Sequence, residues 1–411
     1  MDLVRFTQTL EINFILKTLS KLILLLSILY STHSRADQRF SIDDALSAAF
    51  INSEMAKRFE AEEAALLAEA ETLTVISTPQ VNLSYERVAE ELEFSAFIEQ
   101  PFDLSRWRSA LRTSVSHRAE ALRAEQALWR SDVRTRVLDA FYRVLYYQNR
   151  LVAYDAWTGR LDRALNDARA RERRGDVSGY QLRRIEREIY LAQTRRSNER
   201  LAQAEASTEL AELTGWDLDF LIEGNLRPSA EETIERKVSP ELERLARLEL
   251  ALVSEAEAYG LPALRDWSLG AGYRHTELGQ EVGHGFLMTL SFPLALWNND
   301  SPRLREIEAK RIALRTESVF QKRILEKQMA AAEDQLAQAL FLLTQREEAS
   351  ALGKLTRLAQ VSFDAGESSI VDLLDAFESE FEVQLATIEM EWEARRASNM
   401  LRKFERIEVS K

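Results

Sequence analysis

The chain has 411 residues, of which 45% are hydrophobic and 29% are charged, so disorder is not expected. Its formal net charge of −13 makes it a poor candidate for nucleic acid, because neutralising phosphates needs a basic face. The absence of cysteine excludes disulfides, thiolate metal sites and cysteine nucleophiles. Only 13 glycines and 7 prolines interrupt the chain, which is typical of very long helices.

Residues 1–36 are predicted to be a signal peptide. Lys17 and Lys21 precede an apolar run, residues 22–30, that is too short to cross a bilayer. Ser34-Arg35-Ala36 fits a signal-peptidase site, with cleavage before Asp37. A buried N-terminal helix is the alternative, and the long segment before the apolar run leaves the true start codon open.

The first half begins with a predicted helix from residue 40 to about 74, with Ser41 at its N-cap. Apolar and polar residues then alternate, which predicts two strands at about 79–88 and 91–101, the second ended by Pro101. One face of this strand pair carries the apolar side chains of Val81, Leu83, Tyr85, Leu92, Phe94, Ala96 and Ile98.

The second half repeats this pattern at about 266–275 and 283–293, with a loop around residues 277–282 and Pro293 at the end. Four strands of about ten residues match the length that spans an outer membrane. The apolar side chains that alternate here are those of Trp267, Leu269, Ala271, Tyr273, Phe286, Met288, Leu290 and Phe292.

Each strand pair is followed by a stretch with almost no helix breakers. Residues 104–174 contain no proline and a single glycine, and residues 302–365 also contain a single glycine. Both stretches are therefore long enough for very long helices, and apolar spacings of three, four and seven over residues 122–151, and again over residues 373–392, are typical of a coiled coil. Residues 224–240, which include two prolines, are the best linker between the halves.

A short motif occurs in both halves. Gly175-Asp-Val-Ser-Gly-Tyr-Gln-Leu182 reappears as Gly366-Glu-Ser-Ser-Ile-Val-Asp-Leu373, at an offset of 191 residues (366 − 175). Each copy separates two helical patterns, so it predicts the tip of a helical hairpin, near 175–182 and near 366–376. The predicted fold is mainly α with a small β part, built from two tandem repeats of β-hairpin plus helical hairpin, 37–228 and 229–411.

The two-faced strands place a physical demand on assembly. A strand that is apolar on one face and polar on the other suits a membrane only in a closed barrel, where no edge is left unpaired. Four strands cannot close, and eight leave an interior filled by side chains. Three chains give twelve strands, so the sequence predicts a homotrimer; a soluble β-hairpin would explain a single occurrence of the pattern.

Several stretches resemble the TolC family of trimeric outer-membrane channels. Residues 366–376 are similar to that family's tip, Gly-x-x-(Ser/Thr)-x-x-Asp-x-Leu-Asp-Ala, and residues 41–46, 100–104 and 292–294 also carry the resemblance. It covers about residues 39–407. The resemblance implies a twelve-stranded barrel on a twelve-helix tunnel in the outer membrane of a Gram-negative cell, with most of the mass in the periplasm.

The resemblance also implies a function and partners. The chain would be the passive exit duct of a tripartite efflux system, bound to outer-membrane lipid, a periplasmic adaptor and an inner-membrane pump of the RND type. A soluble periplasmic coiled-coil adaptor is the alternative, although adaptors have one helical hairpin and this chain has two. No enzyme and no cofactor are expected, since neither a nucleotide loop nor a nucleophile arrangement is present.

The resemblance assigns roles to residues at the hairpin tips. Asp372 and Asp375 would form rings that narrow the periplasmic entrance, which would favour cations over anions. Their alternative role is that of an ordinary helix N-terminal charge. The predicted tip and adaptor-docking residues are Gly175, Ser178, Leu182, Gly366, Ser369 and Leu373.

Some family members carry an arginine two residues after the tip glycine, which holds the tip shut against an acid of the neighbouring hairpin. Ser368 occupies that position here, and Gln181 in the first hairpin is also uncharged, so this charged latch is not expected. Residues 292–298 resemble the heavy-metal efflux branch, which makes metal cations a possible cargo. No metal site is predicted; whether His275 and His284 bind metal across their loop stays open, as do the cargo, the adaptor, the pump and the resting state.

Overall fold

The structure is a computed structural model, and it describes residues 39–89, 91–228, 239–260, 265–294, 300–350 and 355–403, without the side chains of 347–350. The predicted signal peptide lies outside the described residues. Within those ranges, the helices include none with both the length and the apolar character needed to cross a bilayer.

The chain divides into two compact units, and each takes segments from both predicted repeats. The tip unit consists of residues up to Asn52, Val133–Ile234 and Ala332–Lys403. The strand unit consists of the described residues within Ser53–Asp132 and Glu235–Ala331. The two long helices α4 (Trp107–Glu172) and α7 (Ser301–Ser350) contribute to both units.

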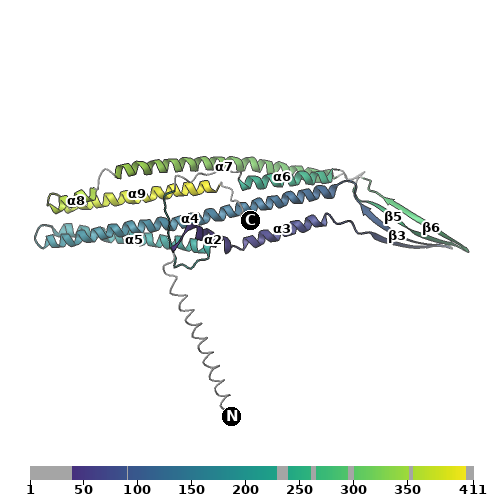
Figure 1. The fold of residues 1–411 in the computed structure, drawn as a ribbon, viewed down its shortest axis with the longest axis horizontal. Helices are drawn as coiled ribbons and strands as arrows, with labels where there is room; N and C mark the ends of the chain where they lie inside the picture. The colour runs from purple at the N-terminus through teal and green to yellow at the C-terminus, as the bar shows by residue number, and fades with distance from the viewer. Residues whose placement is uncertain are drawn as a thin grey trace, which may run out of the picture. The chain divides into compact units, whose positions relative to one another are not determined.

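The tip unit contains two helical hairpins, α4 with α5 and α8 with α9 (Figure 1). A short parallel strand pair, β1 with β4, joins its N-terminal segment to the segment after α5. Besides the second part of α4 and the last part of α7, its elements are β1 (Arg39–Phe40), α2 (Ile42–Ile51), α5 (Gly179–Thr214), β4 (Leu221–Ile222), α8 (Leu355–Asp364) and α9 (Ile370–Arg402).

Aromatic side chains fill the core between the two hairpins. The rings of Trp157 in α4 and Phe381 in α9 are stacked with centroids 4.3 Å apart, and both side chains are buried. Tyr146 stacks on Trp392 in the same way, 5.6 Å apart. The Tyr146 hydroxyl donates to Glu389, and burial together with this carboxylate raises the pKa of Tyr146. The core therefore joins the first helical hairpin to the second.

One buried cation also connects the two halves of the sequence. The Arg395 guanidinium in α9 donates to the backbone carbonyls of Leu226 (2.9 Å) and Arg227 (2.6 Å), and it lies 4.3 Å from the ring centre of Tyr142. These carbonyls lie in the segment that follows β4. These charged hydrogen bonds replace the hydrogen bonds to water that the guanidinium and the carbonyls lose on folding.

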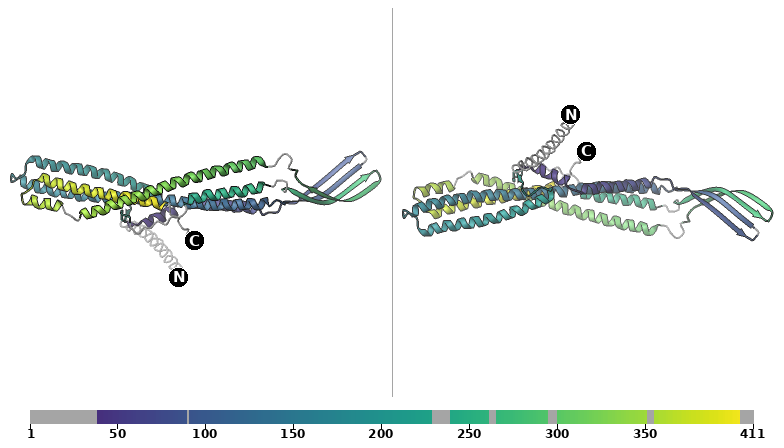
Figure 2. Two further views of the ribbon diagram at one scale, coloured as in Figure 1. Left: turned by 90° about the horizontal axis from the view of Figure 1, so that it is seen from above. Right: turned by 90° about the horizontal axis from the view of Figure 1, so that it is seen from below.

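The strand unit contains a four-stranded antiparallel sheet of order β2-β3-β5-β6, which Figure 2 shows as neighbouring arrows. The outer strands β2 and β6 are its edges. Besides the first parts of α4 and α7, its elements are α3 (Met55–Thr72), β2 (Gln80–Val88), β3 (Glu91–Phe102), α6 (Pro240–Tyr259), β5 (Trp267–Leu278) and β6 (Glu281–Ser291).

One predicted continuous helix is interrupted, and another runs into residues outside the described ranges. The helix expected from residue 40 to 74 is split into α2 and α3; Asn52, which ends α2, donates its side-chain amide to the carbonyl of Thr214. The stretch expected to be one helix up to residue 365 contains α7 and α8, and residues 351–354 between them lie outside the described ranges.

The strands differ from the sequence prediction at their ends. β3 continues through Pro101 to Phe102, because its pairing with β5 reaches that far. β5 extends to Leu278 and β6 begins at Glu281, so the expected loop around 277–282 is a two-residue turn. Gly279 begins this turn with a φ of +62°, a conformation that glycine adopts without strain.

Candidate functional site

The register of the sheet brings the apolar faces of all four strands together. Leu83 pairs with Ala96, Ala96 with Tyr273, and Tyr273 with Phe286. Because side chains alternate between the two faces, the neighbours two residues away lie on the same side. This apolar face carries Val81, Leu83, Tyr85, Phe94, Ala96, Ile98, Leu269, Ala271, Tyr273, Phe286, Met288 and Leu290.

The apolar face is exposed in the single chain. Leu83 is 69% exposed, Met288 67% and Phe286 76%. A soluble monomer rarely leaves a continuous apolar surface of this extent open to water. The face therefore needs either lipid or another protein against it.

The opposite face of the same sheet is polar and internally hydrogen-bonded. Glu99 accepts a hydrogen bond from the Asn82 side chain at 3.1 Å and another from the Ser268 hydroxyl. Arg274 forms an ion pair with Glu93 across β3 and β5. Such a face suits water, so the two faces of the sheet require different solvents.

Aromatic rings gather where the strands meet the helical segments. Trp267 stacks on Phe292, with ring centroids 5.2 Å apart, and lies 6.4 Å from Phe102. Tyr85 and its pairing partner Phe94 lie further along the apolar face, toward the turn between β2 and β3, and Tyr273 lies near the middle of β5. Aromatic residues at both ends of an apolar band are typical of a membrane-spanning sheet, where they occupy the two interfaces.

The two hairpin tips use the same turn. Gly175 and Gly366 have φ values of +85° and +77°, and each follows the end of a helix. The amide of Asp176 donates to the carbonyl of Arg171 at 3.0 Å, and that of Glu367 to Ser362 at 2.9 Å. These six-to-one bonds close the helix ends in the Schellman arrangement, for which a left-handed glycine is preferred.

Both helices that leave the tips begin with a capping box. Ser178 and Gln181 exchange side-chain and backbone hydrogen bonds at the start of α5. Ser369 and Asp372 do the same at the start of α9, where Asp372 accepts from the Ser369 amide (2.9 Å) and hydroxyl (2.7 Å). These bonds hold the pKa of Asp372 below its ordinary value. Asp372 therefore has a local role in ending the turn.

Two arginines of the first hairpin contact the second hairpin at the tips. Arg184 in α5 forms an ion pair with Asp375 in α9, with 3.3 Å between Nη2 and Oδ1. Arg171 donates to the carbonyl of Phe363 at 3.1 Å and lies 4.1 Å from the centre of its ring. Neither arginine was predicted from the sequence, because both lie outside the motif that the two halves share.

The remaining predicted tip residues divide by exposure. Gly175, Ser178, Gly366 and Ser369 are exposed. Leu373 is only 1% exposed, and it lies in the core against which Leu182 packs. The exposed residues are available to a partner, whereas the leucines hold the two hairpins together.

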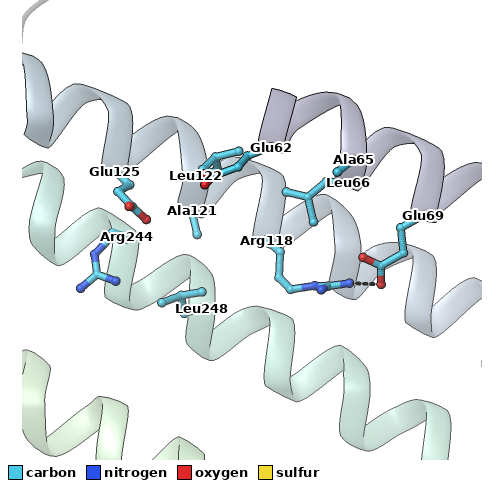
Figure 3. Close-up of a pocket in the computed structure, with 10 residues that line it drawn as sticks. All are labelled: Glu62, Ala65, Leu66, Glu69, Arg118, Ala121, Leu122, Glu125, Arg244 and Leu248. Carbon is cyan, nitrogen blue, oxygen red and sulfur yellow. Dashed lines mark hydrogen bonds and ion pairs between the residues drawn. The ribbon is translucent and has the colours of Figure 1, made fainter. Parts of the chain in front are cut away.

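A cavity of about 350 Å³ lies between α3, α4 and α6 in the strand unit (Figure 3). Its floor is apolar, and Leu66, Ala121, Leu122 and Leu248 line it. Charged side chains surround it, and Arg118 among them is paired with Glu69. Within the described ranges, no group of three or more histidine, aspartate or glutamate side chains is arranged to hold a metal ion.

Comparison with known proteins gives matches to solved structures only. No protein-family model and no curated protein matches the chain. A membrane protein from Pseudomonas aeruginosa matches with a TM-score of 0.69 at 14% identity, covering 88% of this chain and 93% of that one. CusC, whose structures record conformational changes accompanying folding and transmembrane channel formation, matches with a TM-score of 0.70 at 13% identity, covering 89% and 92%. The outer-membrane channel OprN matches with a TM-score of 0.67 at 15% sequence identity, covering 89% of this chain and 90% of that one.

These similarities extend over nearly the whole length of each matched structure, so this chain has the fold of these membrane proteins. The chain has the mainly helical fold of the TolC-family outer-membrane channels, as its tip motif predicted. At 13–15% identity the likeness defines the fold alone.

Proposed function

We propose that the chain is the outer-membrane exit duct of a tripartite efflux system. Three copies would join their four-stranded sheets into a twelve-stranded barrel, and their helical hairpins would continue the pore as a twelve-helix tunnel. Each chain would then comprise two tandem repeats, 37–228 and 229–411. The substrate would pass through passively, driven by an inner-membrane pump.

The single observation that carries this proposal is the two-faced sheet with unpaired edges. Its exposed apolar face suits lipid, and its hydrogen-bonded polar face suits a water-filled pore. The edge strands β2 and β6 need partners before such a sheet can enter a membrane. A second and third copy supply those partners, and twelve strands leave room for an open lumen.

The helices also support association with other copies. Within the described residues, α5, α7 and α8 leave large apolar side chains exposed, which a single chain does not cover. They include Tyr190, Leu201, Val319, Phe320, Leu355, Leu358 and Val361. Burying such side chains in a trimer is favourable by about 1.5–3 kcal/mol for each one fully covered.

The hairpin tips are proposed to face the periplasm and to dock an adaptor through their exposed residues, Gly175, Ser178, Gly366 and Ser369. Asp372 and Asp375 are proposed to lie at the entrance, where Arg184 offsets part of the acidic charge. Metal cations are one proposed cargo, on the resemblance of residues 292–298 to the heavy-metal branch.

The test is to fractionate cells that express the full chain and to measure its mass and conductance. The expected result is an outer-membrane protein that runs as a heat-labile trimer in detergent and forms pores in planar bilayers. A soluble, monomeric periplasmic protein without conductance would overturn the proposal and favour the adaptor alternative. Growth of cells lacking the gene, with added metal salts, tests the cargo separately.

A further inference from the structure

We propose that the β5–β6 hairpin carries a surface site for a borderline divalent metal ion such as Cu²⁺, Ni²⁺ or Zn²⁺, held by His275 and His284. The two residues pair directly across the antiparallel strands. Their Nδ1 atoms are 3.3 Å apart, and their rings are stacked with centroids 5.0 Å apart. This inference does not depend on the channel proposal.

The nitrogen separation matches that of two ligands on one metal ion. Imidazole nitrogens lie about 2.0–2.1 Å from Zn²⁺, so two of them at a tetrahedral angle are separated by about 3.3 Å. His284 is exposed, so its ring is free to turn about χ2, and metal binding would require it to direct its Nδ1 lone pair to the point that the lone pair of His275 faces. The backbone register therefore already provides the spacing that a metal ion requires.

The other ring nitrogen of His275 is also placed as in a metal ligand. Nε2 lies 3.0 Å from a carboxylate oxygen of Glu277, and its N–H donates a hydrogen bond to that oxygen. That bond leaves the lone pair of His275 on Nδ1, the atom that faces His284. A carboxylate behind a ligating histidine fixes the tautomer and ring orientation and makes the imidazole a better donor.

An oxygen atom lies beside the two histidines. The Tyr273 hydroxyl contacts Nδ1 of His284, and the two rings are stacked with centroids 5.9 Å apart. Two imidazole nitrogens with one neighbouring oxygen favour Cu²⁺, Ni²⁺ or Zn²⁺ over Mg²⁺ and Ca²⁺, which prefer oxygen ligands. Cu²⁺ should bind most tightly among these ions.

The test uses the full chain, purified in detergent with a tag that contains no histidine, and titrated with Cu²⁺. We expect about one Cu²⁺ per chain, with an electron paramagnetic resonance spectrum split by two nitrogens. His275→Asn or His284→Asn should remove one nitrogen from the spectrum, and the double variant should lose the site. His117→Asn, in helix α4, is the matched control and should bind like the unaltered protein.

Two further measurements separate the site from general surface binding. Glu277→Gln should weaken Cu²⁺ binding about tenfold while two nitrogens remain. Mg²⁺ should not compete. The proposal is overturned if the double variant binds Cu²⁺ as the unaltered chain does, if the spectrum lacks two nitrogens, or if Glu277→Gln has no effect. Circular dichroism of each variant confirms that it is folded.

Discussion

Arg184 and Asp375 form an ion pair across the two helical hairpins, and each lies two residues after one copy of the tip motif. Their separation of 191 residues (375 − 184) equals that of Gly175 and Gly366. The two hairpin tips are therefore not symmetric in charge, because the first has a cation at the position where the second has an anion. In a trimer, the proposed Asp375 ring would alternate with three arginines.

This pairing changes what the entrance is expected to select. Arg184→Gln should leave Asp375 without its partner and increase cation selectivity, which the reversal potential in planar bilayers measures. Asp375→Asn should have the opposite effect, and the double variant should resemble the unaltered channel. Both side chains are partly exposed, so the stability cost should stay below about 1 kcal/mol.

Arg183→Gln is the control for this prediction. Arg183 is the adjacent arginine, and it pairs with Glu186 of its own helix instead of the second hairpin. Equal shifts in selectivity for Arg183→Gln and Arg184→Gln would mean that only the net charge of the tip matters.

The capping boxes give a prediction about pH. Asp372 has a lowered pKa in the folded chain, so its contribution to the cap is present above the unfolded value of about 3.9. The contribution is lost as pH falls through the lower, folded pKa. Hydrogen-exchange protection in the first turn of α9 should therefore decrease in acid. The first turn of α5, where Gln181 replaces the acid, should not show this decrease.

A comparison of the two capping boxes distinguishes two roles of Asp372, as a cap of helix α9 and as a charge at the entrance. Asp372→Gln should remove the charge and keep the cap, because Gln181 already forms that box in the first hairpin. Ser369→Ala should lose the cap and about 1 kcal/mol of stability. If Asp372→Gln leaves conductance and selectivity unchanged, Asp372 acts in the cap alone and is no part of a constriction.

The two faces of the sheet give a third prediction. Leu83→Arg and Leu290→Arg place a charge on the exposed apolar face, and each should cost about 2–4 kcal/mol if it lies near the middle of a membrane. Asn82→Arg lies on the polar face and should be tolerated better. The yield of heat-labile trimer measures the effect, and equal losses in all three variants would contradict the assigned faces.

The aromatic contact between the hairpins gives a fourth prediction. Trp157 is buried against Phe381, so Trp157→Ala should cost about 3–5 kcal/mol of stability. Val152→Ala, at an exposed position of the same helix, should have little effect. Chemical unfolding in detergent gives both values. A similar loss at Val152 would indicate that this face of α4 is covered in the assembled protein.

Local features were readable from the sequence because they depend on near neighbours. Alternation of apolar and polar residues determined which side of each strand is apolar, since side chains point to opposite faces with a period of two. The tip turns follow from glycine at the left-handed position and a serine three residues before Gln181 or Asp372. Each of these signals lies within a few residues.

Contacts between distant residues were decided by the tertiary structure. The pairing of β3 with β5 extended the strand past Pro101, and the Asn52 side chain at the end of α2 bonds to the carbonyl of Thr214, which is distant in the sequence. The ion pair of Arg184 with Asp375 required two hairpins to pack side by side. The spacing of His275 and His284 depends on the register of β5 and β6, which the two-residue turn between them fixes. Composition alone did not predict that register.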